Sequence, residues 1–220
     1  MSTDDIAERF QRNTAEHQMT VLHDDGLYRH VRFDNLQYNG IYGFDLITWP
    51  NNLAIRGDGV NFMFTIYPTV DLFDLFRQTS HGGGINPGYW QEKVVAGEVK
   101  SWSEEKFRTW LIEEAAGAEA RYPGLVQAVG DQILHSDEHS TEYEATARHA
   151  VASFCHGDFR FYFPDEWELS FDDYDSWFLW ACHAIVWGIA QYDAAKQKPV
   201  ASPPEDSIQF PEPVSAAGGA

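Results

Sequence analysis

The sequence predicts an α+β fold, with an antiparallel sheet in the N-terminal part and helices in the C-terminal part. Residues 19–66 contain short runs of alternating apolar and polar residues, separated by turns rich in Gly, Asn and Asp, as is typical of antiparallel strands. From residue 69 onward, apolar residues recur at helical spacing instead. Because the chain has 220 residues, of which 44% are hydrophobic, it is long enough to bury a sizeable core.

The N-terminal part is expected to form a five-stranded meander preceded by a short amphipathic helix over residues 4–17. The dipeptide Asp25-Gly26 suits the tight turn of a first hairpin, and Asp58-Gly59 suits that of a later one. Between them, Pro50 begins another turn. These turns separate the five expected strands, which are residues 19–23, 27–33, 44–49, 53–57 and 60–66.

The C-terminal part, residues 69–196, is expected to be mainly helical. Ser101 with Glu104, and Thr141 with Glu144, have the spacing of a capping box and predict two helix starts. Residues 159–163, Phe-Arg-Phe-Tyr-Phe, predict one short aromatic strand.

Residues 176–192 are apolar nearly all round, which predicts a central buried helix. This run is shorter than the roughly 20 apolar residues that a bilayer requires, so no membrane association is expected. The proline-rich residues 199–220 are expected to be a disordered tail. The predicted organisation is therefore a single α+β domain over residues 1–198, followed by the tail.

The charge of the chain is strongly negative and unevenly distributed. Thirty-four acidic residues oppose 15 basic ones, giving −19. Residues 1–109 hold 15 acids and 10 bases (net −5), whereas residues 110–220 hold 19 acids and 5 bases (net −14). Such a charge disfavours direct binding to nucleic acid and favours a protein partner with a basic surface.

Two dense carboxylate clusters are the candidate partner-binding residues. Aromatic residues interrupt both clusters, and a partner's Arg or Lys could stack on them. The alternative interpretation is a solvated surface with acidic residues at the start of a helix. The six candidates are Asp165, Glu166, Glu168, Asp172, Asp173 and Asp175.

A second, alternative site would hold a metal ion. His135 and His139 are four residues apart, which would place both imidazoles on one helical face. The same segment also suits a solvated loop between two helices. No cofactor is predicted, and the two cysteines, Cys155 and Cys182, suit reduced thiols in a cytoplasm.

Several strings of this chain resemble a family of bacteriophage and prophage proteins labelled hypothetical, over about residues 20–196. The strings are residues 44–66, 85–93, 103–107 and 177–196. The resemblance implies a phage accessory protein in the cytoplasm of an infected or lysogenic bacterium, and it brings no catalytic residues. The leading hypothesis is a protein that modulates or inhibits a host protein, such as an antiviral defence component.

Two alternative functions stay open at this point. One is a metal-dependent hydrolase or nucleotide-processing enzyme that uses His135 and His139. The other is a virion or assembly component. The sequence contains no phosphate-binding loop and no evident nucleophile with its base, which favours a binding protein over an enzyme. The oligomeric state does not follow from the sequence.

Overall fold

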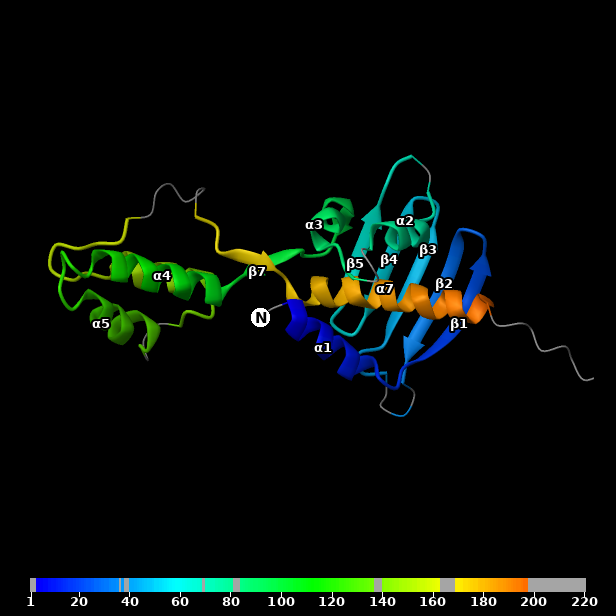
Figure 1. Ribbon diagram of the computed structural model, residues 1–220, viewed down its shortest axis with the longest axis horizontal. Helices are drawn as coiled ribbons and strands as arrows, with labels where there is room; N and C mark the ends of the chain where they lie inside the picture. Colours follow the sequence, from blue (N-terminus) through cyan, green and yellow to red (C-terminus); the bar gives the residue numbers. More distant parts are fainter. Residues whose placement is uncertain are drawn as a thin grey trace, which may run out of the picture.

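The computed structural model describes residues 3–35, 37, 40–68, 70–80, 84–136, 140–162 and 169–197. Within these ranges the fold is α+β, as predicted, with an antiparallel sheet in the N-terminal part followed by helices (Figure 1). Residues 199–220, the expected tail, lie outside the described ranges.

The main sheet has six strands in the order β1-β2-β3-β4-β5-β6, and each neighbouring pair is antiparallel. The five predicted strands are confirmed. The sixth, β6, was not predicted because three residues are too few to show an alternating pattern. The strands are β1 (Gln18–Asp25), β2 (Tyr28–Asp34), β3 (Phe44–Trp49), β4 (Asn52–Gly57), β5 (Asn61–Thr65) and β6 (Val94–Ala96).

Seven α-helices are described, together with a 3-10 segment at Gln91–Lys93 and a π-helical segment at Gly130–Leu134. Three helices precede residue 100: α1 (Thr3–Thr14), α2 (Leu72–Thr79) and α3 (Pro87–Trp90). Four follow it: α4 (Glu104–Ala118), α5 (Leu125–Val129), α6 (Glu144–Ser153) and α7 (Ser176–Gln197).

The first hydrophobic core lies between one face of the sheet and α7, which confirms the predicted central buried helix. Gly188 allows α7 to approach the sheet closely, because a Cβ there would lie 2.8 Å from Leu46 and 3.1 Å from Phe33. Helix α1 joins this core through Phe10, whose ring meets Trp180 edge-on at 5.1 Å. None of the helices in the described ranges has the length and apolar character needed to cross a bilayer.

A second hydrophobic core lies in a lobe formed by residues 103–171, which we call the acidic lobe. Its centre contains Phe107 and Phe171, whose rings meet at 90° with centroids 5.4 Å apart. Two short strands, β7 (Lys100–Trp102) and β8 (Asp172–Tyr174), pair as a ribbon between this lobe and the sheet. Figure 1 shows the lobe extending away from the sheet beyond this ribbon.

The two predicted helices form and begin at Glu104 and Glu144, but neither predicted capping box does. Ser103, not Ser101, caps α4, and its hydroxyl accepts a hydrogen bond from the amide of Lys106 at 3.3 Å. Ser101 lies in β7. Thr141 is buried and donates its hydroxyl hydrogen to Glu104 instead of capping α6. In both cases a tertiary contact uses the hydroxyl that the local pattern had assigned to a helix end.

The predicted aromatic strand over residues 159–163 is also not formed in its described part. Only an isolated bridge joins His156 to Phe159. The rings of Phe159 and Phe161 lie 5.0 Å apart and pack on the core of the acidic lobe. Aromatic residues here contribute to lobe packing without a strand partner.

Candidate functional site

The second predicted carboxylate cluster lies at the junction between the acidic lobe and the sheet. Asp172 and Asp173 belong to β8, where they pair with Trp102 and Ser101 of β7. They were expected to be acidic residues at the entrance of the central helix, and strand pairing places them in the ribbon instead. The first cluster, Asp165, Glu166 and Glu168, lies outside the described residues.

Asp175 has a structural role. Its Oδ1 accepts hydrogen bonds from the amides of Trp177 at 2.8 Å and Phe178 at 3.2 Å, so it caps the start of α7. Its Oδ2 accepts a hydrogen bond from the hydroxyl of Ser101 at 3.1 Å. The carboxylate thus ties α7 to β7, which makes it a poor candidate for direct partner contact.

Asp173 is exposed and forms an ion pair with Lys106, whose Nζ lies 3.2 Å from Oδ1. Partial burial raises the pKa of Asp173, but hydrogen bonds from the Tyr174 amide and from Lys106 outweigh it, so the net pKa is lowered. Lys106 also donates to the carbonyl of Asp172 at 2.8 Å. Of Asp172, Asp173 and Asp175, Asp172 is the one whose exposed carboxylate neither caps a helix nor forms an ion pair in the described contacts.

A pocket at the same junction has four carboxylates and no basic side chain among its described lining residues. We call it the junction pocket. Apolar contacts from Ile6, Trp102 and Leu179 line part of it. Its acidic members are Glu104, Glu105, Asp173 and Asp175. Lys106 pairs with Asp173, and Arg108 pairs with Glu104, so at least these two carboxylates are already neutralised.

The acidic lobe as a whole carries 14 acidic and 5 basic residues, a net charge of −9. Three of its basic residues already form ion pairs with Glu104, Asp173 or Glu144. Glu113 and Glu114 on α4 are exposed, and no described ion pair involves them. Nine of the 14 acids and all five bases lie in the described part of the lobe, so this part carries a net charge of −4.

The acidic lobe also exposes large apolar and aromatic side chains. Tyr143 is 63% exposed between Glu142 and Glu144, and Tyr162 is 82% exposed. Ile112 and Val126 are 47% and 42% exposed. Tyrosine is one of the residue types that most often anchor protein interfaces, so Tyr143 and Tyr162 are the stronger candidates of the four.

The residues of the alternative metal site are only partly described. His135 is exposed and follows the π-helical segment, while His139 lies outside the described residues. In the described ranges, no three His, Cys, Asp or Glu side chains gather closely enough to hold a metal ion. The structure therefore adds no third ligand to the predicted pair.

Cys182 and His183 lie in α7, within the first core. Cys182 is fully buried, and burial raises the pKa of its thiol, so the thiol stays protonated. The ring of His183 stacks on Phe10 with centroids 6.1 Å apart, and burial lowers its pKa. The buried Nε2 of His183 has no hydrogen-bond partner in the described part of the chain.

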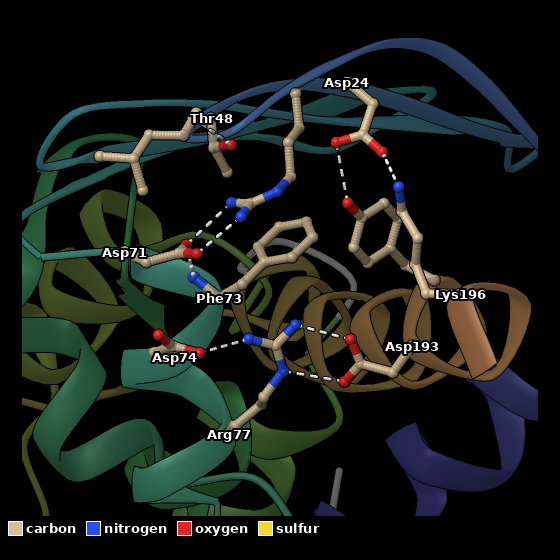
Figure 2. A network of polar contacts seen from close by, with 11 residues as sticks. Asp24, Thr48, Asp71, Phe73, Asp74, Arg77, Asp193 and Lys196 are labelled. Carbon is tan, nitrogen blue, oxygen red and sulfur yellow. Dashed lines mark hydrogen bonds and ion pairs between the residues drawn. The ribbon is translucent and has the colours of Figure 1, made fainter.

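A polar network holds the C-terminal end of α7 and the start of α2 against the sheet (Figure 2). Figure 2 shows the Arg77 guanidinium between Asp74 and Asp193, and the hydrogen bond from Arg77 to Asp193 is the main cause of its raised pKa. Asp24 accepts hydrogen bonds from Lys196 and Tyr192, and the bond from Lys196 is the main cause of its lowered pKa. Because these charges are paired with one another, the network serves the fold.

A charged cluster that was not predicted lies on the sheet face opposite α7. Asp45 is 5% exposed and lies between Arg32 and Arg56 in the strand register. Its carboxylate is 2.8 Å from the Nε of Arg32 and 3.2 Å from the Nε2 of His30. Burial raises the pKa of Asp45, but the hydrogen bonds from Arg32 and the nearby His30 ring outweigh this effect, so the net pKa is lowered. The signal in the sequence is a lone Asp inside the apolar strand at Phe44–Trp49.

No family model, curated protein or solved structure matches this chain. The resemblance to phage proteins therefore stays an expectation.

Proposed function

We propose that this chain is a phage-type accessory protein that modulates or inhibits a host protein by binding a basic surface of it through the acidic lobe. The observation that carries this proposal is the combination, on residues 103–171, of a net charge of −9 with four exposed large apolar side chains. A host antiviral defence protein is the partner class that the phage resemblance favours.

The two kinds of side chain would make different contributions to binding. Exposed apolar and aromatic residues such as Tyr143 and Ile112 can bury area in a partner's pockets and so supply affinity. Exposed carboxylates such as Glu113 and Glu114 attract a basic partner during diffusion and so raise the association rate.

Affinity capture from a bacterial lysate tests the proposal. The bait is the wild-type protein or the triple variant Glu113→Lys, Glu114→Lys, Asp172→Lys, which leaves the capping carboxylate of Asp175 untouched. We expect wild-type protein to retain a specific partner at low ionic strength and to lose it as salt is added, because salt screens exposed charges. The triple variant should not retain it.

The matched control is a second triple variant on the sheet part, Asp25→Lys, Glu92→Lys, Glu98→Lys. All three of these acids are exposed, and the net charge changes by the same amount. With the purified partner, the substitutions at Glu113, Glu114 and Asp172 should slow association far more than this control does, and they should weaken the salt dependence. A partner retained equally by all three proteins would place the interface elsewhere. Failure to retain any protein selectively would contradict the proposal as a whole.

A further inference from the structure

Strand β1 forms an exposed edge of the main sheet. It has eight residues, and all but Met19 are exposed. Among the described elements it pairs with β2 alone, so every second N–H and C=O along it points away from the sheet. The opposite edge strand, β6, has only three residues. The long edge is therefore the one able to accept another strand.

The two halves of β1 differ in how well they are protected. A bulge interrupts the register between Val21 and His23, and Asp24 is tied to α7 by Lys196 and Tyr192. Bulges and charges are the devices that keep edge strands from pairing with other chains. The first half, by contrast, keeps a regular register with β2 and ends at Val21, which is 44% exposed. Leu22, in the bulge, is 48% exposed.

An acidic pocket lies beside this first half of β1. Glu16 and Asp34 supply two carboxylates, and no basic residue lines the pocket. The other lining residues are polar: Gln18, Thr20, Asn35 and Gln37. Arg32 pairs with Thr20 in the strand register. Its guanidinium donates hydrogen bonds to Asp45, so it does not neutralise the carboxylates of the pocket.

The two faces of β1 differ in chemistry. Gln18 and Thr20 pair with Asp34 and Arg32, and their side chains lie on the pocket side. Met19 and Val21 pair with the buried Phe33 and Val31, and so lie on the apolar side of the sheet. Because side chains alternate along a strand, an added strand would present its residues to these two environments in turn.

We propose that β1 binds an extended segment of a partner protein as a further strand, with basic side chains directed to Glu16 and Asp34 and the alternate apolar side chains beside Val21. Main-chain hydrogen bonds would supply affinity, and the alternation would supply specificity. A second copy of this chain is a poorer occupant, since each copy carries a charge of −19 and the two repel.

This surface is separate from the acidic lobe. Figure 1 places β1 at the far end of the sheet from α4 and α5. The inference therefore goes beyond the proposed function and does not depend on it.

A capped peptide of four Lys-Val repeats is a suitable probe, and a block peptide of four Lys followed by four Val is its control for attraction to a negative protein. Binding to the full-length protein is measured by fluorescence anisotropy, and amide hydrogen exchange locates the site. We expect the alternating peptide to bind more tightly than the block peptide and to slow exchange in residues 18–22. A peptide with Gln in place of Lys should bind more weakly.

Val21→Lys should weaken the alternating peptide about fivefold, the factor expected for one lost cross-strand apolar pair. Val95→Lys, at a 60% exposed position on the opposite edge, is the matched control and should leave binding unchanged. Asp34→Asn should reduce the preference for Lys over Gln without changing the edge itself. Thermal unfolding of each variant verifies that it is folded.

Three results would overturn the inference. Equal affinity for the alternating and block peptides would mean attraction by charge alone. Protection of amides in the acidic lobe would place the peptide there. A dimer in sedimentation that Val21→Lys dissociates would make a second copy the occupant of this edge.

Discussion

Arg29 and Asp71 form a two-point ion pair between strand β2 and the start of helix α2. Their nitrogen and oxygen atoms lie 2.9 and 2.7 Å apart, and the two side chains are only 11% and 14% exposed. Oδ1 of Asp71 also accepts a hydrogen bond from the amide of Phe73 at 2.9 Å, so the same carboxylate caps α2. One side chain thus joins the helix start to the sheet.

The two roles of Asp71 can be separated by substitution. Asp71→Ala removes both the cap and the ion pair, and we expect it to lower the free energy of unfolding by about 3 kcal/mol, because the guanidinium of Arg29 is left nearly buried without its partner. Asp71→Ser keeps a capping oxygen and should recover about 1 kcal/mol of this loss. Urea unfolding measures both. Equal stabilities of the Ala and Ser variants would show that the cap contributes nothing.

Gly188 should resist enlargement, because α7 packs on the sheet at this position. A Cβ there would lie 2.8 Å from the Cδ1 of Leu46, within a fully packed core. We expect Gly188→Ala to destabilise the protein by about 1 kcal/mol or more despite its better helix propensity.

Gly117 in α4 provides the matched control. A Cβ at Gly117 meets no atom within 4 Å, and the residue is exposed. Gly117→Ala should therefore stabilise the protein by about 0.5–1 kcal/mol. Thermal unfolding of the two variants should shift in opposite directions, and a higher unfolding temperature for Gly188→Ala would contradict the close packing of α7 on β3.

Burial of His183 should make the protein less stable at mildly acidic pH. Burial lowers the folded-state pKa of His183 below its ordinary value of 6.5, so the unfolded chain binds a proton first as the pH falls. Its contribution to stability is complete above pH 6.5 and is lost as the pH falls from 6.5 through the lower folded-state pKa.

His183→Leu removes this contribution and the unpartnered Nε2. We expect the variant to match or exceed wild-type stability at neutral pH, since an apolar replacement of a buried unpaired group is neutral or favourable. The stability difference between variant and wild type should grow as the pH is lowered through 6 in steps. A difference that does not change with pH would mean that His183 does not titrate on unfolding.

Asp45 should control stability at more acidic pH. Its folded-state pKa is lowered from 3.8, so its contribution is present above that value and is lost as the pH falls through the lower folded-state pKa. Asp45→Asn keeps the shape but removes the charge beside Arg32 and His30, and we expect a loss of about 2 kcal/mol at neutral pH.

The exposed Asp25, in the first hairpin, is the control for Asp45. Asp25→Asn should change stability by no more than about 0.5 kcal/mol. Urea unfolding at several pH values below 5 compares the two variants. If Asp45→Asn had the same acid dependence as wild type, another carboxylate would dominate that range.

Much of the sheet could be predicted because its signals are local. Alternation along each strand and the glycines of the turns fix neighbouring strands, and Gly26 and Gly59 do adopt positive φ values of 60° and 77°. Helix α7 was equally accessible, since a segment that is apolar all round has to be buried. The candidate site was less predictable. Asp172 and Asp173 lie in a strand only because they pair with Trp102 and Ser101, about 70 residues earlier in the chain.

The amino-acid sequence by itself determined the five-strand meander, the central helix and the excess of negative charge in the C-terminal half. Only the tertiary structure decided that residues 103–171 bury a core of their own, that Asp175 is used as a helix cap, and that Asp45 lies buried among cations. The physical reason is the separation of the interacting residues along the chain. Periodicity depends on neighbouring residues and indicates which face of one element is buried, whereas the partner of each polar group depends on contacts between distant segments.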